Sequence, residues 1–279
     1  MRVFLRAASA FVLALLALSA APAVAVIGGV PDGTAHPNVG MIVGLDSARN
    51  DFPVLLCTGT LVKPDVVLTA AHCVQRDNGP YTNLNYVITF SSTVALDETL
   101  FPLKPLDGIA GTPVPYAGYD NTINYRQAGR SEFVAEGADD VGLLRLAAPV
   151  SGVTPAMIVS AGELTPFDSG NKPDIQQVGY GDNRLGPPGQ PGSYFTDGFR
   201  NRSLFPMKKL TSTVIWGNAN PNNENGYGLP ASGDSGSPFF VNGRIAAVFA
   251  AGDNNNNVFG PRLDTGAARA FLASEGVLN

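Results

Sequence analysis

Residues 233–238 read GDSGSP, and residues 68–73 read LTAAHC. The first stretch holds Ser235 between two glycines, a composition that predicts a tight turn. Backbone N–H groups around such a turn can converge on one point, which makes this turn a candidate oxyanion hole. The second stretch places His72 directly after an apolar run, where a lone histidine is more often structural than catalytic. The histidine therefore points to chemistry only in combination with the serine turn.

The composition is that of a folded protein built from many short elements. The chain has 279 residues, of which 44% are hydrophobic and 15% are charged, with 32 Gly and 22 Pro. These values exclude a mainly disordered chain and a coiled coil, and the turn-forming residues favour strands joined by loops. The formal net charge of -5 provides no basic field, so nucleic acid is not an expected partner.

Residues 1–25 are typical of a secretory signal peptide. Two arginines form a positive start, an apolar run follows, and small residues lead to Ala25. We expect cleavage after Ala25, with Ala23 as the nearest rival and an uncleaved membrane anchor as the alternative interpretation. No later segment is apolar and long enough to span a bilayer, so the sequence predicts a secreted protein with no membrane contact after cleavage. Export also permits disulfides.

The apolar runs after the signal peptide are short and rich in β-branched and aromatic residues, which predicts buried strands. Only residues 263–278 have apolar residues at helical spacing. Residues 147–168 contain three prolines and are the expected connection between two β halves. The expected strands are residues 41–45, 54–56, 66–70, 86–90, 142–146, 176–180, 210–216, 238–241 and 245–249.

The stretches around His72, Asp140 and Ser235 resemble the trypsin/chymotrypsin family of serine proteases, and they follow that family's order along the chain. Weaker similarities occur at residues 26–29, 57–61 and 179–181. The resemblance implies an all-β fold of two packed six-stranded antiparallel β-barrels with a C-terminal helix. We expect residues 26–158 to form the barrel that carries the histidine and the aspartate. Residues 159–279 are expected to form the barrel that carries the serine.

The resemblance also implies catalytic roles. His72 would act as the base that takes the Ser235 proton and returns it to the leaving amine. Asp140 would hold the imidazole, and it is preferred to its neighbour Asp139 because it stands directly before the strand that reads VGLL. The N–H groups of Gly233 and Ser235 would bind the developing oxyanion.

Cys57 and Cys73 are the only cysteines. The family places a disulfide at these two positions, and the alternative is a pair of free buried thiols. Neither a metal nor a cofactor is expected, because no histidine or cysteine cluster has the spacing of metal ligands. His36 lies outside every matching stretch and is interpreted as an ordinary loop residue.

The residues aligned with the family's specificity pocket depart from its usual pattern. Leu229 stands where trypsin-type members have an aspartate, which disfavours cleavage after Lys or Arg. Ala250, Ala251 and Gly252 replace the usual Ser-Trp-Gly wall, and Asn257 is the candidate third wall. We therefore expect a small or medium apolar residue before the cut bond.

Residues 26–29 resemble the free N-terminus that family members insert beside the aspartate preceding the nucleophile. We expect the Val26 ammonium to pair with Asp234, so that signal cleavage alone activates the chain. The expected function is that of a secreted serine endopeptidase, a monomer that acts on protein or peptide substrates. The alternatives are a catalytically idle protease fold that serves as a binding protein, and an esterase that uses the same triad.

Overall fold

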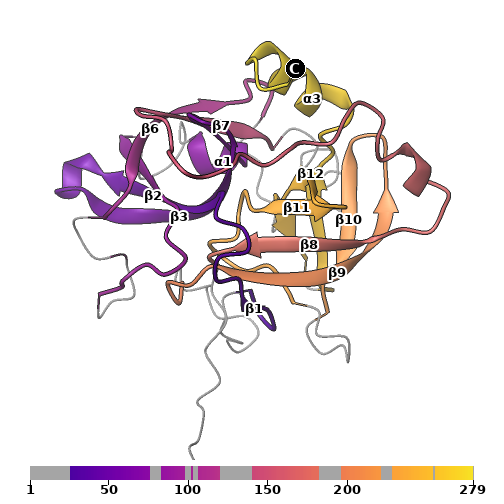
Figure 1. The fold of residues 1–279 in the computed structure, drawn as a ribbon, viewed down its shortest axis with the longest axis horizontal. Coiled ribbons are helices and arrows are strands. Elements are labelled where there is room, and N and C mark those ends of the chain that lie inside the picture. Colours follow the sequence, from indigo (N-terminus) through magenta and orange to yellow (C-terminus); the bar gives the residue numbers. More distant parts are fainter. Residues whose placement is uncertain are drawn as a thin grey trace, which may run out of the picture.

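The computed structural model describes residues 26–75, 83–97, 102, 106–119, 140–181, 196–220, 228–253 and 255–278. A closed barrel forms one side of the molecule, a curled sheet forms the other, and a helix lies near the C-terminus (Figure 1). The expected all-β fold with a C-terminal helix is therefore confirmed. None of the described helices is long and apolar enough to cross a membrane. The predicted signal peptide, residues 1–25, lies outside the described residues.

Six antiparallel strands close the first barrel in the order β2-β3-β4-β7-β6-β5. Its interior is filled by fully buried aliphatic side chains such as Ile42, Leu61 and Leu144. The pairing of β4 with β7 sets Thr69 opposite Gly142, which brings the neighbourhoods of His72 and Asp140 to the same barrel edge. The strands are β2 (Val39–Asp46), β3 (Phe52–Lys63), β4 (Val66–Thr69), β5 (Leu84–Thr89), β6 (Ile109–Pro115) and β7 (Gly142–Leu146).

The second of the two expected barrels is a curled sheet with the strand order β12-β11-β8-β9-β10-β14-β13, and β1 pairs with β9. The ends of the curl meet at one antiparallel bridge between Ala247 and Arg262. Phe205 and Phe239 pack edge to face in its core. The strands are β1 (Val30–Pro31), β8 (Asp174–Gly179), β9 (Asn201–Leu210), β10 (Val214–Asn218), β11 (Pro238–Val241), β12 (Arg244–Val248), β13 (Ala251–Gly252) and β14 (Asn257–Pro261).

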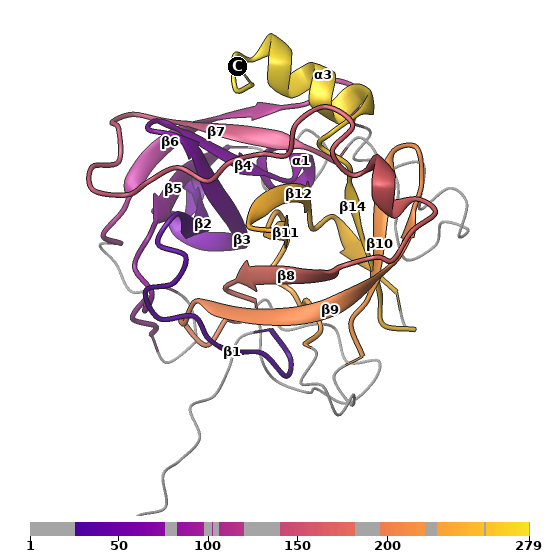
Figure 2. The ribbon, with the colours of Figure 1, turned by 45° about the vertical axis from the view of Figure 1, so that its right-hand side comes forward.

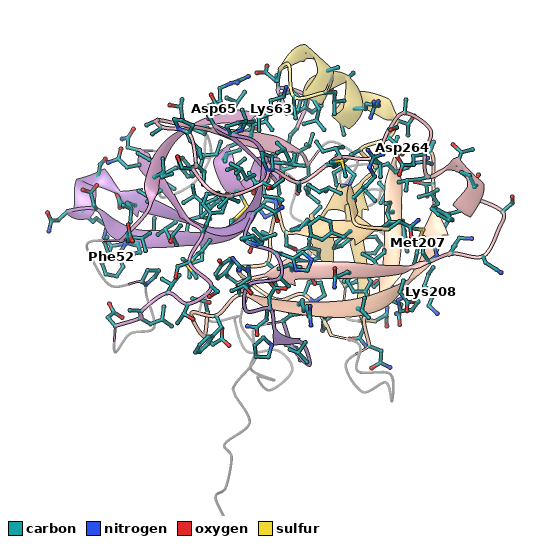
Figure 3. The ribbon with its side chains drawn as sticks, in the orientation of Figure 1. Phe52, Lys63, Asp65, Met207, Lys208 and Asp264 are labelled. Carbon is teal, nitrogen blue, oxygen red and sulfur yellow. A yellow bond between two sulfur atoms is a disulfide. The ribbon has the colours of Figure 1, made fainter. Side chains whose placement is uncertain are left out.

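The strand expected at residues 210–216 is wrong, because it straddles a turn. β9 ends at Leu210 and β10 begins at Val214, and the Thr211 hydroxyl accepts from the Val214 N–H between them. The sequence analysis did not predict β9, because it identified strands by continuous apolar runs and buried and exposed side chains alternate along β9. Met207 is buried and its neighbour Lys208 is exposed (Figure 3).

The C-terminal helix α3 (Gly266–Ser274) follows the second sheet in sequence but packs beside β7 of the first barrel (Figure 2). Arg145 of β7 donates to both the backbone carbonyl and the carboxylate of Glu275, at 3.0 and 2.8 Å. The rings of Tyr116 and Phe271 are 5.6 Å apart. The helix therefore joins the two halves of the molecule.

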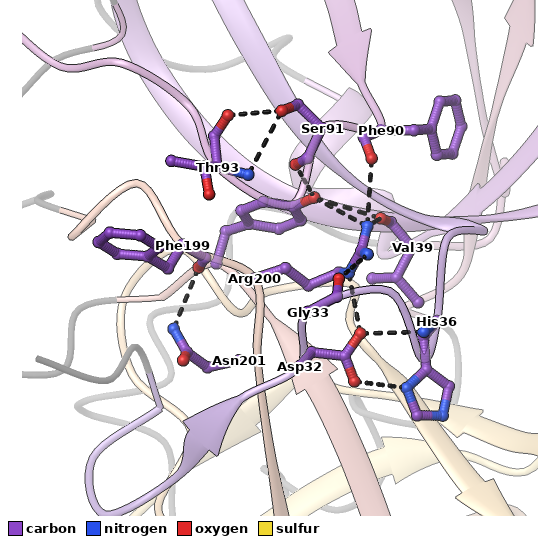
Figure 4. A network of polar contacts seen from close by, with 11 residues as sticks. Asp32, Gly33, His36, Val39, Phe90, Ser91, Thr93, Phe199, Arg200 and Asn201 are labelled. Carbon is purple, nitrogen blue, oxygen red and sulfur yellow. Dashed lines mark hydrogen bonds and ion pairs between the residues drawn. The ribbon is translucent and has the colours of Figure 1, made fainter. Parts of the chain in front are cut away.

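A buried polar network ties the N-terminal segment to both sheets (Figure 4). Arg200, whose side chain is 2% exposed, donates from Nε to Asp32 at 3.0 Å and from Nη1 to the carbonyl of Val39 at 3.1 Å. The other oxygen of Asp32 lies 2.6 Å from Nδ1 of His36. Burial by itself would raise the pKa of Asp32, but the contacts with His36 and Arg200 outweigh it and lower that pKa. His36 is thus a loop residue with a fixed partner.

Tyr180 extends this network toward the second sheet. Its hydroxyl donates to the Ser91 carbonyl at 2.7 Å and lies 3.4 Å from Nη1 of Arg200. Burial raises the pKa of Tyr180 to about 12, although the nearby Arg200 charge partly offsets the rise. The phenol is therefore held in its protonated form between the two halves.

Candidate active site

His72 and Asp140 are joined by two hydrogen bonds. His72 lies in the short helix α1 (Ala71–Val74), which begins just after β4, and Asp140 comes just before β7. The backbone N–H of His72 and its ring Nδ1 lie 2.9 and 2.7 Å from the two carboxylate oxygens of Asp140. Asp140 is fully buried, whereas the His72 side chain is 24% exposed. The double contact fixes the imidazole and leaves Nε2 as the ring nitrogen that can act on another group.

The turn that carries Ser235 depends on two glycines. Gly233 and Gly236 have φ values of 95° and 80°, in the region that glycine adopts without strain from a Cβ. At Gly236 there is also no space, because an added Cβ would overlap the Thr69 hydroxyl and the Thr58 carbonyl. The sequence GDSGSP therefore forms the tight turn that its glycines predicted.

Two N–H groups of this turn remain without an acceptor within the part of the chain that the structure describes, and they are those of Gly233 and Ser235. By contrast, the N–H groups of Asp234, Gly236 and Ser237 each donate to a backbone carbonyl. Paired N–H donors free of internal partners are what an oxyanion hole requires. No hydrogen bond joins the Ser235 hydroxyl to the His72 ring among the described residues.

The histidine and the serine turn come from different halves of the chain and are held together across their boundary. The Thr58 N–H of β3 donates to the Ser235 carbonyl at 2.8 Å. Cys57 and Cys73 form a disulfide, which confirms the expected pairing, and the Cys73 sulfur lies 3.6 Å from the same carbonyl oxygen. His72 is next to Cys73 in sequence, so this bond anchors the histidine loop beside the turn. With both sulfurs oxidised, the cluster of His72 and the two cysteines offers no thiolate to a metal.

The N-terminal segment enters the second sheet close to this turn. Val26 is fully buried, and Ile27 exchanges two backbone hydrogen bonds with Leu229, at 3.0 and 2.8 Å. Asp234 is also fully buried, and its two carboxylate oxygens accept from the N–H groups of Gly181 and Ala231, each at 2.9 Å. The residues expected to pair at the N-terminus therefore both lie in the interior of this half.

Known proteins resemble this chain in one segment of its sequence and in its fold. A family model described as Trypsin matches residues 29–101, a range that includes His72. The resemblance to the trypsin family is therefore confirmed for this part of the chain. No curated protein matches the sequence.

Solved structures show that this chain has the chymotrypsin-like fold. An HL collagenase is 14% identical with a TM-score of 0.64, and the match covers 91% of this chain and 100% of that chain. A Glu endopeptidase in complex with MPD is 16% identical with a TM-score of 0.58, covering 88% of this chain and 93% of that one. The scabies mite inactivated protease paralogue S-D1 is 13% identical with a TM-score of 0.62, and the match covers 91% of this chain and 99% of that one. Likeness at these identities establishes the fold alone.

The expected pocket residues lie on separate segments of the second half of the chain. Ala250 is buried, and Ala251 and Gly252 form β13, which pairs with β14. Leu229 is half-buried and packs on the hydrophobic core that both sheets share. These side chains are all small or apolar, and none of them carries a charge that could pair with a basic substrate residue.

Asn257, the candidate third wall, is engaged with its own loop. Its side-chain amide donates to Asp253 at 2.9 Å, and its oxygen accepts from Asn218 at 3.2 Å. Val258 is the residue opposite Gly252, and its Cγ1 lies 3.8 Å from where a Cβ on that glycine would stand. Val258 is fully buried in the hydrophobic core.

Proposed function

We propose that this chain is a secreted serine endopeptidase whose catalytic residues are Ser235, His72 and Asp140. The observation that carries the proposal is the double hydrogen bond from His72 to the buried Asp140. We assign the histidine and the aspartate to a first barrel domain, residues 26–158, and the serine to a second, residues 159–279. The disulfide supports export to an oxidising compartment.

In the proposed acylation, the Ser235 oxygen attacks the carbonyl carbon of the scissile peptide bond while Nε2 of His72 takes the hydroxyl proton. The carbonyl electron pair moves to its oxygen, which the N–H groups of Gly233 and Ser235 stabilise as an oxyanion. Asp140 keeps the proton on Nδ1 and stabilises the imidazolium that forms. Its burial keeps water away from this contact, so the carboxylate does not exchange its partner.

Collapse of the intermediate breaks the C–N bond, and the imidazolium gives its proton to the departing amine. An acyl-enzyme ester on Ser235 remains. Water then attacks that ester, His72 takes the proton from the water, and the same two N–H groups hold the second oxyanion. Release of the acid returns the proton to the Ser235 oxygen and regenerates the enzyme.

The proposal includes activation at the N-terminus. Cleavage after Ala25 would create an ammonium on Val26, and the buried carboxylate of Asp234 is the acidic group expected to pair with it. Asp234 lies between Gly233 and Ser235, so the new charge would stabilise the turn that carries both oxyanion-binding N–H groups. Burial of Val26 and the backbone exchange between Ile27 and Leu229 support this insertion.

We also propose a preference for small or medium apolar residues before the cut bond. A buried ammonium without a partner costs several kcal/mol, and Leu229 offers it none. Profiling of cleavage in a diverse peptide mixture tests this preference. Cleavage mainly after Lys or Arg would contradict it.

A catalytically idle binding protein is the second candidate. The scabies mite neighbour is described as an inactivated protease paralogue, so this fold exists without activity. The missing Ser-Trp side chains at Ala250 and Ala251 favour this candidate to a small extent. Reaction with a serine-directed fluorophosphonate separates the two: the proposed enzyme takes up one label per chain at Ser235, and an idle fold takes up none.

An esterase with the same triad is a third candidate, because the acyl chemistry is identical up to the leaving group. Matched amide and ester substrates with the same acyl part distinguish it. An endopeptidase hydrolyses both, whereas an esterase turns over the ester alone.

A further inference from the structure

Thr58 of β3 contacts the serine turn twice. Its backbone N–H donates to the Ser235 carbonyl at 2.8 Å, and its hydroxyl donates to the Gly233 carbonyl at 2.9 Å. Thr58 is fully buried in the first barrel, while both acceptors belong to the turn that precedes β11 of the second sheet. One residue thus holds the carbonyl on each side of Asp234, with its hydroxyl at Gly233 and its backbone N–H at Ser235.

The same hydroxyl also accepts a hydrogen bond. The Tyr180 N–H donates to it at 3.2 Å, and the next N–H in the chain, that of Gly181, donates to the Asp234 carboxylate at 2.9 Å. The Thr69 hydroxyl in turn donates to the Thr58 carbonyl at 2.8 Å. The Thr58 side chain therefore has both its donor and its acceptor engaged, which leaves it a single orientation.

The flexibility of Gly233 makes the contact with the Thr58 hydroxyl important. Gly233 has no Cβ to restrict its backbone, and its φ of 95° is one of several conformations open to it. The Ser235 carbonyl is bound by a backbone N–H that any residue at position 58 except proline would supply. The Gly233 carbonyl, in contrast, is bound by a side-chain hydroxyl that only serine or threonine could supply there.

We infer that the Thr58 hydroxyl is a positioning group that holds Gly233, and with it the oxyanion-binding N–H pair, in the geometry needed for the transition state. This inference rests on the proposed function. Thr58 does not touch the substrate, so it acts only through the turn. Its loss should reduce stabilisation of the oxyanion while leaving substrate binding in the ground state nearly unchanged.

The test compares three variants of the full mature chain. Thr58→Val keeps the shape and the backbone N–H but removes the hydroxyl. Thr58→Ser restores it. Thr60→Val makes the same change two residues along β3, at a fully buried hydroxyl that has no hydrogen-bond partner among the described residues. Active sites are first counted with a fluorophosphonate, so that any loss of folded protein is not mistaken for lost catalysis.

We expect Thr58→Val to lower kcat for a peptide amide about tenfold and to change KM less than about twofold. Affinity for a peptide aldehyde, whose adduct with Ser235 presents an oxyanion, should fall by a similar factor. Affinity for the matching peptide alcohol should not. Thr58→Ser and Thr60→Val should both stay within about twofold of the wild type.

Three results would overturn the inference. In the first, Thr58→Val keeps the wild-type kcat per labelled site. In the second, Thr58→Ser loses as much activity as the valine variant, which would assign the effect to packing. In the third, the wild type itself takes up no label and cleaves no peptide, which would overturn the proposed function together with the inference. If the wild type takes up the label and cleaves peptide, and Thr58→Val has the same kcat, the inference is overturned but the proposed function is not.

Discussion

Arg200 and Asp32 form a buried ion pair that ties the N-terminal segment to the second sheet, with Nε of the guanidinium 3.0 Å from the carboxylate. Both side chains are almost completely removed from solvent. Because the same segment carries Val26 toward the serine turn, the pair anchors the part of the chain on which the proposed activation depends.

Arg200→Leu should lower the free energy of unfolding by about 3–5 kcal/mol, because it leaves the Asp32 carboxylate buried without its guanidinium. Urea unfolding at neutral pH measures the change. The partly exposed pair of Arg145 and Glu275 is the control, and Arg145→Leu should cost less than about 1 kcal/mol. Equal effects from the two variants would contradict the claim that burial makes the Arg200 contact important.

Asp32 should contribute an acid-sensitive part of the stability. Its pKa is lowered in the folded state, so its contribution is present above the unfolded value of about 3.9 and is lost as the pH falls through the lowered folded value. Asp32→Asn should therefore flatten the dependence of the unfolding free energy on pH below about 4. An unchanged acid slope in this variant would show that other carboxyl groups account for it.

Tyr180 should contribute a part of the stability that is lost at alkaline pH. Its pKa is raised to about 12 in the folded state, compared with about 10 in the unfolded chain. Stability from the neutral phenol is complete below pH ~10 and is lost as the pH climbs toward ~12, a decrease of about 2–3 kcal/mol. Tyr180→Phe should remove this part of the alkaline decrease, as followed by urea unfolding between those pH values. The prediction fails if the phenylalanine variant loses stability as steeply as the wild type.

A free N-terminus at Val26 should be required for full activity. A variant that keeps two extra residues before Val26 should fold with an unchanged thermal midpoint but hydrolyse amides at least about tenfold more slowly, because its ammonium cannot reach Asp234. N-terminal sequencing of the secreted protein identifies the natural start. Full activity in the extended variant, or a mature start far from Val26, would mean that the chain is activated in another way.

The parts of the site that lie on regular strands could be predicted from the sequence. The apolar runs before His72 and after Asp140 indicated β4 and β7, and the glycines around Ser235 indicated a turn. Each of these signals is local, since it depends on residues next to one another in the chain.

Contacts between distant polar residues could not be predicted in this way. Arg200 and Asp32 are 168 residues apart in sequence, and nothing in either segment marks its arginine or aspartate as buried. The two contacts of Thr58 with the serine turn also cross from one half of the chain to the other. Strand periodicity gives the face on which a side chain lies, but the partner that it meets depends on how the two sheets pack.

Amide hydrolysis by purified Ser235→Ala, compared with the wild type, tests the central claim most directly. The account predicts a loss on the order of 10⁴-fold or more with a nearly unchanged thermal midpoint, because the hydroxyl acts in the transition state rather than in packing. A His72→Ala variant should lose a similar factor, and the double variant should be little worse than either, since the two residues act as a unit. Retention of more than about a tenth of the wild-type activity in Ser235→Ala would contradict the assignment of Ser235 as the nucleophile.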